Sequence, residues 1–114
     1  MAIEKLIQQI NNDPDSTDFK EVIATIEANY AFTPTAFKNG LVNNSADKNQ
    51  GSCKIFAFAK LNGLTKEQTL PLFGQYYFDE VLKHPDTDNH NNIRQFMKTG
   101  WGGITFDGIP LVKT

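Results

Sequence analysis

Cysteine, arginine and long apolar runs are scarce in this chain of 114 residues. Its one cysteine, Cys53, excludes an internal disulfide and suits a reducing compartment. Arg94 is the sole arginine, the net charge is −2, and no basic cluster occurs, which argues against nucleic acid as a partner. The longest apolar run is far shorter than the roughly 20 residues of a membrane-spanning helix, so we expect no membrane span.

Hydrophobic residues make up 39% of the chain, which is enough for one core, and no internal repeat or domain boundary interrupts it. We therefore expect a single domain over residues 1–114. Apolar spacing predicts about five helices, over residues 3–10, 19–30, 53–61, 65–82 and 90–99. The N-terminal residues have the pattern of this first helix and not that of a signal peptide. Pro71 should kink the fourth helix or delay its start.

Capping signals mark several of these helix starts. Asp18 with Glu21, or Ser16 and Thr17, can cap the second helix, and Thr65 with Gln68 forms a capping box for the fourth. Asp88 or Asn89 can cap the fifth helix, which should end at Gly100.

Extended structure is expected in two places. Residues 31–42 predict an edge strand, since Pro34 cannot donate to a central ladder, with a turn at Asn39-Gly40. Near the C-terminus, Asp107-Gly108 separates two alternating apolar runs, a strong hairpin signal, and residues 32–37 are the expected sheet partner. The fold class expected is α+β: helices on a small antiparallel sheet with a C-terminal hairpin.

Residues 49–54, where a polar loop meets an apolar helix, are a candidate functional site. Ser52 can cap that helix with its hydroxyl, and Gly51 allows close approach of a ligand. Cys53 would then lie at the positive end of the helix dipole, which favours a thiolate.

Several segments resemble the HopJ type III effector family. They are 26–30 (Ile-Glu-Ala-Asn-Tyr) with 32–34 (Phe-Thr-Pro), 37–40, 51–54 (Gly-Ser-Cys-Lys), 73–77 and 92–101, so the resemblance covers most of residues 19–106. It implies a bacterial protein, cytoplasmic or secreted by a type III system into a host cell, with a host or bacterial protein as partner. It implies no established reaction. A packed helix at the extreme N-terminus differs from the unstructured, Ser-rich signals of such effectors, so a relative that stays in the bacterium remains an alternative.

One hypothesis is a Cys-dependent hydrolase or transferase, with Cys53 as nucleophile, His90 as base and Asp88 orienting the ring. Half ionisation of a thiol at pH 7 needs about 2 kcal/mol of thiolate stabilisation, whereas a helix dipole supplies roughly 0.3–1 kcal/mol. A small buried cysteine that fills space is the favoured interpretation.

The preferred hypothesis is a binding domain for a partner or a small anionic ligand. His90 and Arg94 are four residues apart and, with free helix amides, could hold a phosphate or carboxylate. Gly51, Ser52 and Lys54 could face the same anion from a second helix start. For Arg94 itself, pairing with Asp86, Asp88 or another surface acid is the favoured interpretation.

Three further features complete the candidates. Tyr76 or its neighbour Tyr77 can present a hydroxyl to a cleft, and Trp101 is either a binding aromatic or an anchor for a turn. Alternate residues 84, 86, 88 and 90 could hold a metal ion, but acidic loops before helices are usually capping features, so we expect no metal and no cofactor.

Overall fold

The computed structural model describes residues 2–114. Its α-helices are α1 (Ile3–Asn12), α2 (Phe19–Asn29), α3 (Gln50–Leu61), α4 (Lys66–Thr69) and α5 (Asn91–Thr99). Shorter turns of 3-10 helix are η1 (Pro14–Ser16), η2 (Leu70–Phe73) and η4 (Gly100–Gly103), and η3 (Tyr76–Val81) is a π-helix. Strands are β1 (Tyr30–Phe32), β2 (Phe37–Asn39), β3 (Val42–Asn44), β4 (Ile104–Phe106) and β5 (Leu111–Lys113). The α+β class expected from the sequence is confirmed.

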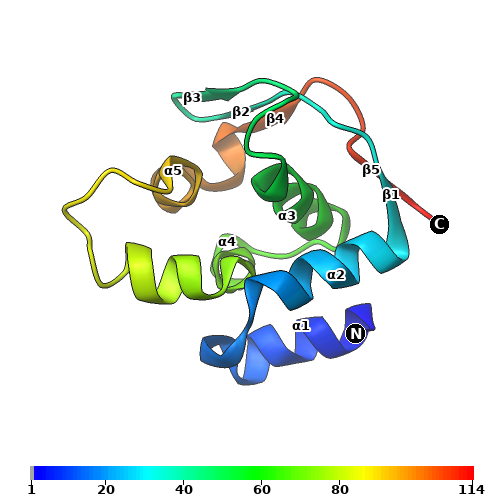
Figure 1. The fold of residues 1–114 in the computed structure, drawn as a ribbon, viewed down its shortest axis with the longest axis horizontal. Coiled ribbons are helices and arrows are strands. Elements are labelled where there is room, and N and C mark those ends of the chain that lie inside the picture. The colour runs from blue at the N-terminus through cyan, green and yellow to red at the C-terminus, as the bar shows by residue number, and fades with distance from the viewer. Residues whose placement is uncertain (1) are drawn as a thin grey trace.

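Helix α3 lies at the centre of the molecule, between two small antiparallel sheets on one side and α2 on the other (Figure 1). Because it is apolar nearly all round, it can be covered on every side. The ring of Phe56 contacts the rings of Phe37, Phe73, Phe96 and Trp101, at centroid separations of 4.8 to 6.4 Å. The core is therefore built around this one helix.

The predicted N-terminal helices form and pack together, with α1 on the outer side of α2 (Figure 1). Asp18 stands at the start of α2 as expected, although its side chain makes no capping hydrogen bond within the described chain. Tyr30 leaves the helix and begins β1 instead, where its ring packs on the edge of Phe58.

The predicted C-terminal hairpin is wrong. The two apolar runs do not pair with each other: β4 pairs with β2, Phe37 opposite Phe106, while β5 pairs with β1, Phe32 opposite Leu111. The expected partner segment is therefore confirmed, but it is shared between the two runs. Each run pairs with a strand that packs over the core and thereby buries one apolar residue, Ile104 in β4 and Leu111 in β5. This burial outweighs the local preference of Asp-Gly for a tight turn.

The hairpin of this fold lies at Asn39-Gly40, the other turn expected from the sequence. Strands β2 and β3 are joined through Gly40 and Leu41, and Gly40 has φ +57°, a conformation that glycine adopts without strain. The order of that sheet is β3-β2-β4.

The segment after α3 changes helix type twice. The capping box of Thr65 and Gln68 is present, and the chain leaves α-geometry just before Pro71, as the expected kink requires. Gly74 then turns the chain with φ +58°, and a Cβ there would lie 2.6 Å from the backbone nitrogen of Phe19. Only glycine fits this contact, after which the chain continues as η3.

Two expected helix starts need correction. Helix α3 begins at Gln50 with Asn49 as N-cap, so Ser52 is its third residue and not its cap. Helix α5 begins after His90, and neither Asp88 nor Asn89 caps it, although Gly100 ends it as predicted. None of the helices within residues 2–114 is long and apolar enough to cross a membrane.

Candidate functional site

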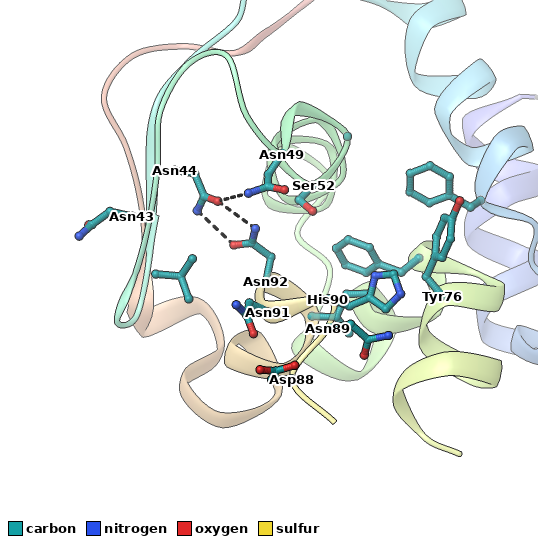
Figure 2. A pocket seen from close by; sticks show the side chains of 15 residues that line it. Asn43, Asn44, Asn49, Ser52, Tyr76, Asp88, Asn89, His90, Asn91 and Asn92 are labelled. Carbon is teal, nitrogen blue, oxygen red and sulfur yellow. Dashed lines mark hydrogen bonds between the residues drawn. The ribbon is translucent and has the colours of Figure 1, made fainter. Parts of the chain in front are cut away.

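A cleft of about 630 Å³ opens where α3 and α5 begin side by side. Strand β3 and its following loop form one wall, and Phe19, Phe73 and Tyr76 form the opposite wall. Asparagine is the main polar residue of the lining, which includes Asn43, Asn44, Asn49, Asn89, Asn91 and Asn92. Figure 2 shows the amides of Asn44, Asn49 and Asn92 turned toward one another on one side of the hollow, with His90 and Tyr76 on the other.

Both helix starts at the cleft have an unusual backbone. Asn49 and His90 are the N-cap residues, each with φ +54°, and they are the only non-glycine residues between 2 and 114 with positive φ. Positive φ is uncommon outside glycine, although asparagine and histidine adopt it more often than most residues. Neither side chain caps its helix, because each turns elsewhere.

Backbone amides are therefore free at both starts. In the described part of the chain, the amides of Gly51, Ser52, Asn91 and Asn92 donate to no protein acceptor. The hydroxyl of Ser52, which lines the cleft, likewise has no hydrogen-bond partner in this part of the chain. Unpartnered N–H groups at a helix start attract negatively charged atoms.

A cluster of side-chain amides ties the sheet to α5 beneath the cleft. Asn92 Oδ1 accepts from Nδ2 of Asn39 and of Asn44, both at 3.1 Å, and Asn92 Nδ2 donates to Asn44 Oδ1 at 2.9 Å. Asn49 Nδ2 donates to the same Asn44 oxygen at 2.8 Å, which links the start of α3 to the cluster. Asn39, Asn44 and Asn92 are all at most 5% exposed. This network fixes the distance between the two helix starts.

His90 is held by the π-helix. Its Nε2 lies 2.8 Å from Glu80 Oε1, and its ring packs on Tyr76 with the centroids 5.2 Å apart. Tyr76 in turn meets Phe19 edge to face. Glu80 does not line the cleft, so it contacts the histidine from behind.

The loop that carries Asp88 and Asn89 is fastened by Arg94. Its Nε donates to the carbonyl of Asn89 at 2.6 Å, and one Nη donates to Thr87 Oγ1 and Asn89 Oδ1. Neither Asp86 nor Asp88 forms an ion pair with Arg94 in the described residues, contrary to the alternative expected from the sequence. The guanidinium therefore shapes the wall and does not line the cleft.

The structure brings together some of the residues singled out in the sequence and separates others. Lining the cleft are Gly51, Ser52, Tyr76, Asp88 and His90. Lys54, Arg94 and Trp101 do not line it.

Lys54 and Trp101 have structural partners of their own. Lys54 Nζ pairs with Glu27 at 3.1 Å and lies over the ring of Phe32. Trp101 Nε1 donates to the carbonyl of Leu64 at 2.9 Å, so this tryptophan anchors a turn against the core.

Cys53 is fully buried, and its thiol faces the carbonyl of Thr35 at 3.6 Å. Burial raises the pKa of the thiol to about 11, although the nearby charge of Lys54 acts in the opposite direction. His90 directs its Nε2 to Glu80, and Asp88 is exposed. This geometry does not support a nucleophilic thiolate activated by His90.

The alternate residues His84, Asp86 and Asp88 are all exposed, and of these Asp88 lines the cleft. Across residues 2–114, no three side chains of His, Cys, Asp or Glu gather as they would around a metal ion.

Comparison with known proteins gives the chain a family. The model of the HopJ type III effector protein family matches residues 3–111, so the chain belongs to this family. A crystal structure of an unknown function protein, VPA0580, is similar at 46% identity with a TM-score of 0.96, covering 100% of this chain and 95% of that one. No curated protein matches the sequence.

Proposed function

We propose that this HopJ-family domain acts by binding, and that the cleft between α3 and α5 takes a small ligand bearing a carboxylate or phosphate group. The observation that carries the proposal is the set of free backbone amides from two helices at one hollow of about 630 Å³. A ligand oxygen could accept from Gly51 and Ser52 on one side and from Asn91 and Asn92 on the other.

The charges around the cleft set the expected strength. Each helix start favours an anion by about 0.3–1 kcal/mol. Lys54 and Arg94 add no direct contact, and Asp88 on the rim opposes a negative ligand. Two such starts give at most about 2 kcal/mol together, so we expect a minimal anion to bind weakly, with a Kd on the order of 30 mM or above. A natural ligand would gain affinity from side-chain amides and Tyr76.

Family membership extends the proposal to a biological setting. A type III effector meets its target in a host cell, where an acidic side chain or chain terminus of a host protein would present the same carboxylate chemistry. A bacterial partner with such a group is the alternative setting.

The proposal can be tested by an NMR titration of the whole chain with sodium sulfate, using sodium chloride at equal ionic strength as control. We expect saturable shifts in the amides of Gly51, Ser52, Asn91 and Asn92. The variant Ser52→Asp places a carboxylate in the first turn of α3, where it satisfies the free amides from within and favours the helix. It should weaken sulfate binding by roughly tenfold or more.

The control variant Gln8→Glu adds the same charge to the exposed face of α1 and should leave binding unchanged. Sulfate shifts that never saturate, or that survive Ser52→Asp, would show that this cleft is not an anion site.

A further inference from the structure

The contact between Glu80 and His90 places a carboxylate behind an imidazole that lines the cleft. Nε2 of the ring lies 2.8 Å from Glu80 Oε1, and Nδ1 has no hydrogen-bond partner within residues 2–114. His90 remains 27% exposed, so its free edge is open to a ligand. Figure 2 shows the imidazole beside Tyr76 at the side of the hollow that faces the asparagines.

The charged groups around this ring are few. The π-helix η3 contributes Glu80 and the phenol of Tyr76, and the loop before α5 contributes Asp88 on the rim. Arg94 of α5 donates to the loop and also to the backbone carbonyl of Glu80, at 3.5 Å, so one positive charge lies near the pair. The lining contributed by α3 and β3 is uncharged. Among these groups, Glu80 is the carboxylate in direct contact with the ring, through Nε2.

The carboxylate decides which nitrogen carries the first proton. An ionised carboxylate only accepts hydrogen bonds, so the neutral ring keeps its proton on Nε2. Nδ1 is then a lone pair directed away from Glu80, and a lone pair repels an anion. A second proton converts Nδ1 into a donor and the ring into a cation.

We propose that Glu80 and His90 form a proton-linked recognition pair, so that the cleft binds an anionic ligand together with one proton from solvent. The proposal rests on the anion-binding function proposed above and adds its regulation. In the bound state Nδ1–H donates to a ligand oxygen and Nε2–H donates to Glu80. His90 contacts the ligand, while Glu80 is a positioning residue that holds the ring and stabilises its charge.

Sulfate is a suitable ligand for the test because its own charge does not change in the range where histidine titrates. Its affinity should be measured by NMR at about pH 5.5 and about pH 8, on either side of the usual histidine range. One linked proton allows at most a tenfold gain per pH unit, and we expect at least a tenfold tighter Kd at the lower pH. Cross-peaks of the His90 ring should move with saturation at the same Kd.

Two variants separate the pair from a purely structural role. His90→Asn keeps a residue that tolerates the positive φ, and it should bind sulfate equally at both pH values. Glu80→Gln keeps the shape of the side chain but removes its charge, and it should lower the ratio of the two affinities at least threefold. A matched control, Asp79→Asn, removes the neighbouring charge, which pairs with Lys83 instead, and should leave the ratio as in the native protein.

The outcomes distinguish the two proposals. No saturable binding at either pH overturns both. Saturable binding that Ser52→Asp abolishes, but that is equal at both pH values, leaves the cleft as an anion site and overturns the proton-linked pair. A pH ratio that survives in His90→Asn or in Glu80→Gln also overturns it, whatever these variants do to stability.

Discussion

Replacement of Asn92 tests whether the buried amides hold the two helix starts together. Asn92→Ala removes one acceptor and one donor, and with them the hydrogen bonds to Asn39 and Asn44. Each net hydrogen bond contributes about 0.5–1.5 kcal/mol, but the partners keep other contacts: Asn39 retains the carbonyl of residue 92, and Asn44 retains Asn49. We expect a loss of about 2–3 kcal/mol in the free energy of unfolding.

Asn92→Asp is the sharper change because it keeps the shape and replaces the donor by a charged oxygen. That oxygen would face Asn44 Oδ1, the acceptor now 2.9 Å from Asn92 Nδ2, in a site that is 5% exposed. A buried charge without a donor costs more than a lost hydrogen bond, so the loss at neutral pH should exceed about 3 kcal/mol. At a pH low enough to protonate the carboxyl, the variant regains a donor and should recover part of this loss.

Urea unfolding followed by the fluorescence of Trp101 measures these changes as a shift in midpoint. The matched control is Asn91→Ala, an exposed neighbour in the same helix turn, which should change stability by less than about 0.5 kcal/mol. If Asn92→Ala changes the free energy of unfolding as little as this control, or if Asn92→Asp lowers it no more than Asn92→Ala does, the amide cluster does not hold the two helix starts together.

Two further predictions concern positions away from the cleft. The thiol of Cys53, whose pKa is raised from 9.0 to about 11, should react with iodoacetamide only as fast as the chain unfolds. Because the unfolded chain ionises at the lower pKa, the folded state should lose up to roughly 3 kcal/mol of stability as pH rises from 9.0 to 11, measured by urea unfolding. Gly74→Ala would bring a Cβ within 2.6 Å of the backbone nitrogen of Phe19 at φ +58°, and it should lower the free energy of unfolding by more than about 3 kcal/mol, measured by calorimetry. Gly63→Ala, at φ +66° with nothing within 4 Å, should lower it by only about 1 kcal/mol, and equal losses would contradict the close contact at Gly74.

The helices could be predicted from the sequence because their apolar residues recur with helical spacing. This held for α1 and α2, whose buried faces are set by local order along the chain, while α3 could be predicted from its nearly continuous apolar run. Strand pairing depends on contacts between distant residues. The two runs around Asp107 each pair elsewhere because β1 and β2 are already packed over α3, and no local pattern near Asp107 contains that information.

The place of the site could also be predicted in part. Gly51 and Ser52 mark one helix start and His90 marks the other, and the structure puts both starts at one cleft. Glu80 was missed because it reaches His90 from a π-helix, whose wider turn has no recognisable spacing in the sequence. The functional interest of the asparagines was missed as well, since their density in two separate loops is the only signal, and loops are commonly rich in asparagine.

At the cleft this chain departs from the local rules that stabilise helices. A serine or aspartate N-cap in extended conformation would satisfy the free amides of α3 and α5, and each such cap contributes about 1 kcal/mol. The chain instead has Asn49 and His90 at φ +54°, a conformation that itself costs on the order of 1 kcal/mol, and both side chains are turned to other partners. Helices α1 and α2 also begin without a side-chain cap, but within residues 2–114 only α3 and α5 have an N-cap residue with positive φ. These two starts, a π-helix and a buried amide cluster meet at one hollow. Such local costs concentrated at one place are typical of a binding site, because a ligand can supply the acceptors that the missing caps do not.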